Sequence, residues 1–202
     1  MKRIGVLISG RGTNLQALID AQKRGEISGE IAVVISNKSK AYGLERARSA
    51  NIKTEIVTKK THPIREEHDK RVVELLKQYN VDFVVLAGYM RLITEHLINP
   101  FQNRIINIHP SLLPSFPGID AQKQALEYGV KITGCTTHIV TLDMDAGPII
   151  LQEYVPVFDT DTRDTLAERI LEKEHEILVE TVQLLCEDRI RVTGRITKIT
   201  GE

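Results

Sequence analysis

The sequence predicts one α/β domain: a mostly parallel, twisted sheet with helices on both faces and later strands added at one edge. Two observations support this. Short apolar runs rich in β-branched residues alternate with segments of helical period. The runs are apolar at successive positions, so both faces of each strand would be buried, as in a parallel sheet covered on both sides.

The elements follow in order along the chain. We expect the first strands at residues 4–8, 31–35, 54–57, 83–87 and 104–108. Amphipathic helices are expected between them, the clearest stripe being Val72, Leu75, Leu76 and Tyr79. After residue 109 the pattern changes, and residues 132–141 and 149–157 predict the added edge strands. A last helix is predicted from about residue 161 to 186, with Asp161 or Thr162 as its N-cap.

Composition excludes several classes of protein. The 202 residues carry 27 Lys and Arg against 27 Asp and Glu, so the net charge of zero gives no sign of nucleic-acid or membrane binding. Two cysteines are too few for a disulfide framework. No window approaches the roughly 18 apolar residues of a membrane span, and the N-terminus does not read as a signal peptide. We therefore expect a cytoplasmic protein.

A glycine-rich turn follows the first strand, at Ser9-Gly10-Arg11-Gly12-Thr13-Asn14. Glycines allow close backbone approach, and a helix N-terminus offers N–H groups to a phosphate. The third glycine of a dinucleotide motif is replaced by Leu15, and Ser36-Asn37-Lys38 stands where an acidic residue would be expected, which argues against NAD. The lysine of a P-loop is also missing, which argues against ATP. A phosphate monoester fits better, and a turn that uses glycine for geometry alone remains the alternative.

The strongest signal is Asn107-Ile108-His109 at a predicted strand end. Side chains alternate along a strand, so Asn107 and His109 share one face. Ligands of open α/β sheets bind at the carboxyl ends of strands, where this pair lies. An amide and an imidazole there can stabilise a carbonyl oxygen as charge develops on it. The alternative is a polar strand end with a structural histidine.

Five motifs in chain order resemble those of the folate-dependent formyltransferases. They are Ser-Gly-x-Gly-Thr-Asn at 9–14, Leu-Ala-Gly-Tyr-Met-Arg at 86–91, Asn-x-His-Pro-Ser-Leu-Leu-Pro at 107–114, Thr-His-x-Val at 137–140 and Asp-x-Asp-x-Gly-Pro-Ile at 143–149. The resemblance covers nearly the whole chain and implies a Rossmann-like formyltransferase fold. It also implies one domain over residues 1–202, with a ribonucleotide phosphate-binding half at about 1–100 and a folate-binding half at about 101–202.

The resemblance is to the branch that acts on glycinamide ribonucleotide. It implies transfer of the formyl group of 10-formyltetrahydrofolate to the amine of that ribonucleotide, in de novo purine (IMP) biosynthesis. Methionyl-tRNA formyltransferases carry an additional C-terminal domain, and formyltetrahydrofolate deformylases carry an N-terminal regulatory domain. We expect neither in this chain.

The resemblance also implies site residues. Asn107, His109 and Asp145 match the catalytic set: Asn107 and protonated His109 would stabilise the tetrahedral oxyanion. Asp145 would favour the imidazolium and hold a water for proton transfer. The phosphate loop matches Gly12, Thr13 and Asn14, and a ribose-binding residue matches Glu174. Folate-lining positions match Arg65, Met90, Arg91, Leu92, Ile93, Asn107, His138, Thr141, Leu142, Asp143, Met144 and Asp145. A cis peptide is implied at Leu113-Pro114.

Glu174 also stands out without the resemblance. It interrupts a predicted apolar stripe on the last helix, made of Ala167, Ile170, Leu171, Leu178, Val182 and Leu185. A buried carboxylate needs partners. Sugar hydroxyls would serve, and a salt bridge with an arginine is the alternative.

Other assignments stay open at this stage. Asp145 can be a turn residue before Gly147-Pro148, and Arg65 a solvated helix charge. Cys135 and His138 would point to opposite strand faces, so Cys135 is expected in the core and no nucleophile pair forms. No metal site and no ATP requirement are expected. The partners would be small molecules, with no nucleic acid or membrane, and the enzyme a monomer or homodimer. A formate-releasing hydrolase and a non-catalytic ribonucleotide-binding protein are the competing functions.

Overall fold

The computed structural model describes residues 1–201, which contain a seven-stranded sheet and a separate two-stranded sheet. The large sheet is made of β1 (Arg3–Ile8), β2 (Glu30–Ser36), β3 (Lys53–Ile56), β4 (Phe83–Leu86), β5 (Ile105–His109), β6 (Ile132–Ile139) and β7 (Ile149–Pro156). Its strand order is β3-β2-β1-β4-β5-β6-β7. Strands β1 to β5 pair in parallel, and β6 and β7 pair antiparallel. The predicted fold class is therefore confirmed.

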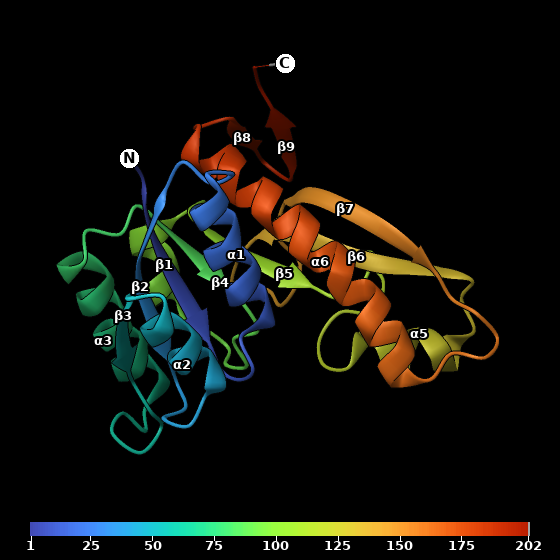
Figure 1. Ribbon diagram of the computed structural model, residues 1–202, viewed down its shortest axis with the longest axis horizontal. Coiled ribbons are helices and arrows are strands. Elements are labelled where there is room, and N and C mark those ends of the chain that lie inside the picture. The colour runs from blue at the N-terminus through green and yellow to red at the C-terminus, as the bar shows by residue number, and fades with distance from the viewer. Residues whose placement is uncertain (202) are drawn as a thin grey trace. The chain divides into compact units, whose positions relative to one another are not determined.

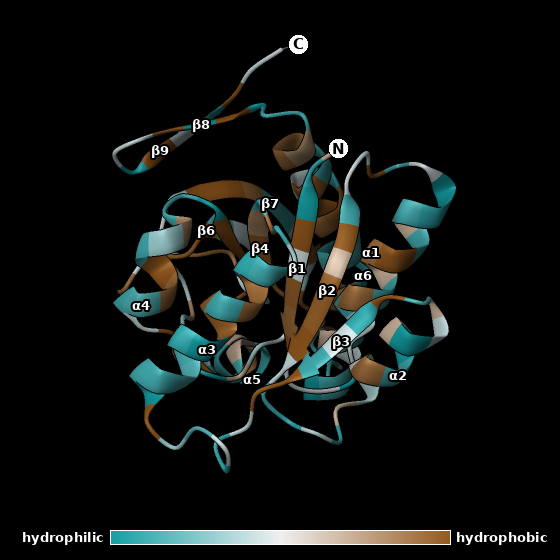
Figure 2. Cartoon of the chain, turned by 90° about the vertical axis from the view of Figure 1, so that its left-hand side faces the viewer, coloured by the Kyte–Doolittle hydropathy of each residue, from teal (hydrophilic) through white to brown (hydrophobic). Residues whose placement is uncertain are grey.

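The chain divides into two compact units, Met1–Asn107 and Ile108–Glu202, of which the second is described to residue 201. The first unit contains helices α1 (Thr13–Arg24), α2 (Tyr42–Ser49), α3 (Arg65–Gln78) and α4 (Glu95–Ile98), and the short 3₁₀ helix η1 (Asn99–Phe101). Helices α1 and α2 lie on one face of β1 to β3, and α3 lies on the other with α4 beside it (Figure 2). Figure 2 also shows β1 and β2 apolar along most of their length, as expected of inner strands buried on both faces.

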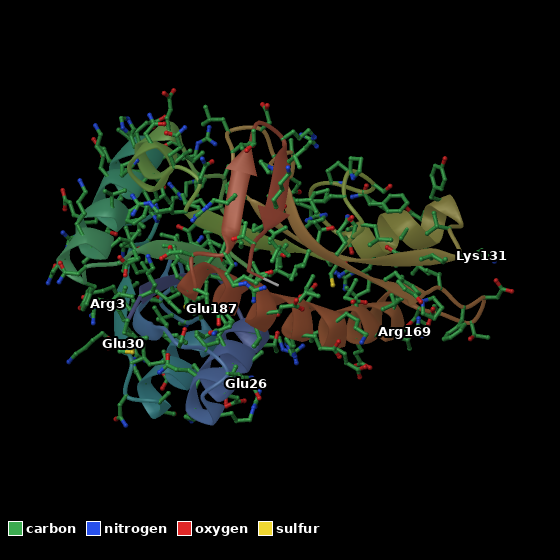
Figure 3. The ribbon with its side chains drawn as sticks, turned by 90° about the horizontal axis from the view of Figure 1, so that it is seen from above. Arg3, Glu26, Glu30, Lys131, Arg169 and Glu187 are labelled. Atoms are coloured by element: carbon green, nitrogen blue, oxygen red, sulfur yellow. The ribbon has the colours of Figure 1, made fainter. Side chains whose placement is uncertain are left out.

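The edge strand β3 is more hydrophilic than its neighbours, because solvent reaches it. At the start of β1, the guanidinium of Arg3 lies 2.6 Å from the carboxylate of Glu30 on β2 (Figure 3). The same residue donates to Tyr79 O at the end of α3. These contacts join β1, β2 and α3 at the amino ends of the two strands, opposite to their carboxyl ends.

The second unit contains α5 (Ala121–Tyr128), β6, β7, α6 (Arg163–Cys186) and the hairpin β8 (Ile190–Thr193) and β9 (Ile196–Ile199). Helix α6 packs along β6 and β7, and the hairpin follows its C-terminal end (Figure 1). Arg169 fixes the first turns of α6, since it pairs with Asp161 at 2.8 Å and lies over the Phe158 ring. The described residues contain no helix long and apolar enough to cross a membrane.

The structure refines the prediction for α6. Thr162 is the N-cap, and its hydroxyl accepts a hydrogen bond from Thr165 N. The apolar face is rotated from the predicted one: Leu166, Ile177 and Leu184 are buried, whereas Ala167, Leu171 and Leu185 are only half-buried. The predicted stripe was wrong at Ala167, Leu171 and Leu185, because the buried face of α6 is shifted around the helix and includes the polar Thr181. The Leu113-Pro114 peptide is cis, as expected.

Candidate functional site

The glycine-rich turn joins β1 to α1 in the first unit. Gly12 is the N-cap of α1 and has a φ of 71°, in the left-handed region that favours glycine. A Cβ at Gly12 would lie 2.7 Å from Gly43 Cα of α2, so a side chain is excluded here for packing as well as for backbone conformation. The turn thereby leaves the first backbone N–H groups of α1, at Thr13 and Asn14, in the position that suits an anion.

Basic residues surround this turn. A surface pocket is lined by residues 9–11 and by Lys38, Lys40 and Tyr42. Arg46 donates from Nε to Arg11 O at 2.9 Å and lies over the Tyr42 ring, which fixes the far side of the turn. The positive charges and the helix dipole both favour an anion. The sequence analysis missed these lysines as candidates, although Lys38 in place of an acidic residue after the second strand was the available signal.

The segment 88–94 follows β4 in the same unit. Met90 N donates to Ser9 Oγ at 2.7 Å, and Thr94 donates from both N and Oγ1 to the buried carboxylate of Asp69. Between these anchors Met90 and Leu92 are exposed, at 73% and 57%, which is unusual for large apolar side chains. The four predicted folate residues from Met90 to Ile93, of which all but Arg91 are apolar, therefore lie on one anchored segment. Arg65 is an exposed first residue of α3.

Three predicted residues meet in the second unit. The Oδ2 atom of Asp145 lies 3.4 Å from His109 Nδ1, and its Oδ1 atom lies 3.7 Å from His138 Nε2. Both histidines are buried, at 4% and 2% exposure. A carboxylate between two buried imidazoles is a cluster that can hold and move a proton. Asn107 lies two residues before His109 on β5 and is half-buried.

The loop after β5 contributes backbone atoms to this cluster. The Nε2 atom of His109 lies 2.9 Å from Phe116 O, and Gly118 N donates to Asp145 Oδ2 at 2.8 Å. Both ring nitrogens of His109 thus face oxygens that can only accept, a carbonyl and a carboxylate. The ring of His109 is thereby held between these two oxygens. Sequence reasoning missed Phe116 and Gly118, because their contributions come from the main chain.

His138 differs from His109 in its surroundings. Burial lowers the pKa of His138, and this outweighs the hydrogen bond to Ile139 O and the charge of Asp145, which both raise it. Burial therefore favours the neutral ring at neutral pH. The same strand carries Cys135, which is fully buried, and burial raises the pKa of its thiol to about 12. A thiol so hard to ionise is not a nucleophile, which agrees with the expected core role.

The remaining predicted residues lie at separate places in the second unit. Leu142 and Met144 are exposed on the loop that precedes Asp145, and Thr141 Oγ1 donates to Asp143 O. Glu174 is 8% exposed within the buried face of α6, so the predicted burial of this carboxylate is confirmed. Among residues 1–201, no group of three or more His, Cys, Asp or Glu side chains could hold a metal ion.

Comparison with known proteins agrees with this combination of fold and side chains. The family model described as formyl transferase matches residues 2–182. This match defines the class of the protein as a formyl transferase.

Individual relatives narrow the class. The chain is 41% identical over 199 residues to phosphoribosylglycinamide formyltransferase of Escherichia coli (strain K12), covering 98% of this chain and 94% of the relative. Its structure superposes on that of glycinamide ribonucleotide transformylase 1 from Symbiobacterium toebii with a TM-score of 0.98 and 52% identity, covering 100% and 95% of the two chains. The chain belongs to the phosphoribosylglycinamide formyltransferase family.

Two further similarities mark the limits of the match. The trifunctional purine biosynthetic protein adenosine-3 of Homo sapiens is 45% identical over 202 residues, and the chain spans only 20% of that protein's length. A formyltetrahydrofolate deformylase structure from Pseudomonas syringae has a TM-score of 0.92 and 31% identity, and the chain covers 66% of it. The same fold therefore occurs in larger proteins and in a relative named for a different reaction.

Proposed function

We propose that the protein transfers the formyl group of 10-formyltetrahydrofolate to the amine of glycinamide ribonucleotide, a step of de novo purine biosynthesis. The observation that carries this proposal is the buried His109–Asp145 pair, with Asn107 two residues before it on the same strand. Lys38 and Lys40 beside the glycine-rich turn, together with the N-terminus of α1, support the ribonucleotide as acceptor, because lysine charges and helix N–H groups both favour an anion.

In the reaction the amine attacks the formyl carbon, which becomes tetrahedral, and the carbonyl oxygen becomes an oxyanion. Asn107 stabilises that oxygen by donating a hydrogen bond to it, and protonated His109 stabilises it by its positive charge, since its two ring nitrogens face Phe116 O and Asp145. Asp145 holds the positive charge on His109 and accepts a hydrogen bond from Gly118 N, so its carboxylate is fixed. The amine then loses a proton, N10 of the folate gains one, and the bond between N10 and the formyl carbon breaks.

The segment 88–94, Arg65 and the loop 141–144 are proposed to line the folate, with His138 and Asn107. Exposed apolar side chains within each unit support this, Met90 and Leu92 in the first and Leu142 and Met144 in the second, since an aromatic ligand covers such side chains. Glu174 is proposed to bind the ribose hydroxyls. No metal ion and no ATP enter the reaction as proposed, and the protein would act in the cytoplasm as a monomer or homodimer.

A formyl-transfer assay with the two purified substrates tests the proposal. Tetrahydrofolate should form only when glycinamide ribonucleotide is present, without ATP, and EDTA should leave the rate unchanged. The His109→Ala variant should lose most of the activity. Formate release without the amine would instead identify a hydrolase, and binding of both ligands without turnover would identify a non-catalytic protein.

A further inference from the structure

The loop that carries Asp145 is held by the C-terminal hairpin through the residues that follow Asp145. Arg195, in the turn between β8 and β9, donates from Nη1 to Ala146 O at 2.7 Å. Thr197 of β9 donates from Oγ1 to Ile149 O at 2.5 Å. Between them Pro148 O accepts a hydrogen bond from Ile139 N of β6 at 2.8 Å. Three carbonyls in the four residues after Asp145 are thus fixed by other parts of the second unit.

This fixation matters because the backbone at Asp145 is strained. Its φ is 52°, in the left-handed region that a residue with a side chain seldom adopts. Such a conformation persists only where neighbouring contacts hold it. The residue after Asp145 is Ala146, whose carbonyl is the acceptor for Arg195.

We infer that Arg195 is a positioning residue for Asp145, and that the β8–β9 hairpin acts as a brace for the catalytic loop. This inference rests on the proposed function, since it assigns Arg195 a role in the same site. Arg195 contacts the main chain of the loop at Ala146 O. It acts by keeping the Asp145 carboxylate between His109 and His138.

The hairpin offers a matched control. Arg191 of β8 has the same charge and is exposed on the same two-stranded sheet, two residues from the turn. The Arg195→Ala variant should lower kcat by about 3- to 10-fold, the equivalent of roughly 0.7–1.4 kcal/mol, and leave both KM values within about twofold. Arg195→Lys should recover part of the loss, because an ammonium group can still donate to Ala146 O. Arg191→Ala should match the wild type.

Coupling to Asp145 separates positioning from a general loss of stability. If Arg195 acts through Asp145, then adding Arg195→Ala to an Asp145→Asn enzyme should change kcat by less than about twofold. Thr197→Val removes the hydroxyl that donates to Ile149 O at nearly constant side-chain volume, and this variant should resemble Arg195→Ala. An Arg195→Ala enzyme with wild-type kcat, or an equal loss in both backgrounds, would overturn the inference.

A second readout does not depend on turnover. NMR signals of the His109 and His138 rings should move in Arg195→Ala and stay in place in Arg191→Ala. Unchanged ring signals in Arg195→Ala would refute the positioning role. A wild-type protein without formyl transfer would refute the proposed function alone, and the ring signals would still decide whether Arg195 positions Asp145.

Discussion

At the scale of single residues, the candidate site depends on how one carboxylate is shared. Asp145 lies near both His109 and His138, yet the two rings have different surroundings. His109 faces acceptors on both sides, whereas burial lowers the pKa of His138. Asp145 can therefore support a positive charge on His109 while His138 remains a neutral donor or acceptor.

Removing the charge of Asp145 at constant shape tests this. We expect Asp145→Asn to lower kcat by about 10²–10⁴-fold, the usual contribution of one positioned acid–base group, and to change KM little. His109→Ala should cost at least as much. The double variant should be little worse than the worse single variant, because the two residues act as one unit. Steady-state kinetics for both substrates provide the measurement, and fully additive losses would contradict the coupled pair.

The phosphate loop can be tested without disturbing the fold. Thr13 is the first residue of α1, whose first turn contains no acidic residue. An aspartate there interacts favourably with the helix dipole, so Thr13→Asp should not lower the melting temperature. Its charge should repel a phosphate by about 1–4 kcal/mol at 4 Å, which raises the KM for the ribonucleotide at least about fivefold. The folate KM should hardly change.

Thr13→Asn is the control for this experiment, since it has nearly the same shape as the aspartate and no charge. It should keep the ribonucleotide KM within a few-fold of wild type. Equal increases in both KM values for Thr13→Asp would show that the turn does not bind the phosphate.

At the scale of elements, the sequence predicts the strongly apolar segments best. Strands β1, β2 and β4 bury nearly every residue, so their runs of Val, Ile and Leu were sufficient. No apolar stripe located helices α2 and α5, because each has only eight residues and buries two or three of them. The hairpin β8–β9 was missed as well: its strands have four residues each and are largely exposed, so the alternation of apolar and polar residues in β8 is too short to stand out.

The antiparallel pair β6–β7 depends on one close backbone contact. A Cβ at Gly134 would lie 1.9 Å from Glu153 O on the paired strand. Because backbone on both sides must shift, Gly134→Ala should destabilise the fold by about 1–3 kcal/mol and lower the melting temperature by roughly 2–12 °C. Gly10→Ala is the control, since a Cβ there meets nothing within 4 Å. Calorimetry of both variants should show a large drop for Gly134→Ala alone.

At the scale of the whole molecule, the sequence predicted which residues matter better than how they are held. The motif at 107–114 indicated His109, and the motif at 143–149 indicated Asp145. In the second unit His109 Nδ1 and Asp145 Oδ2 lie 3.4 Å apart. The groups that hold these two side chains in place could not be predicted from the sequence, for a physical reason. Phe116 and Gly118 act through main-chain atoms, and Arg195 lies 50 residues after Asp145 along the chain, so no local spacing connects them.

Acid should destabilise the whole molecule in a defined pH window. The folded protein holds the pKa of His138 below its ordinary value of 6.5 by burial, and burial also lowers the pKa of His175 on α6. The unfolded chain therefore binds more protons than the folded protein as the pH falls below about 6.5. It follows that the free energy of unfolding decreases as the pH decreases. The slope for the fully buried His138 can reach about 1.4 kcal/mol per pH unit.

Asp161 acts in the same direction but only in stronger acid. Its hydrogen bonds with Arg169 hold the pKa of its carboxyl far below 3.8, so the stability it contributes is present above pH 3.8 and lost below it. Denaturant unfolding between pH 7 and pH 5 should thus report the histidines. We expect the slope with pH to be smaller in His138→Gln and in His175→Gln than in the wild type, whatever the absolute stability of each variant. Identical slopes in all three proteins would show that neither buried ring resists protonation in the fold.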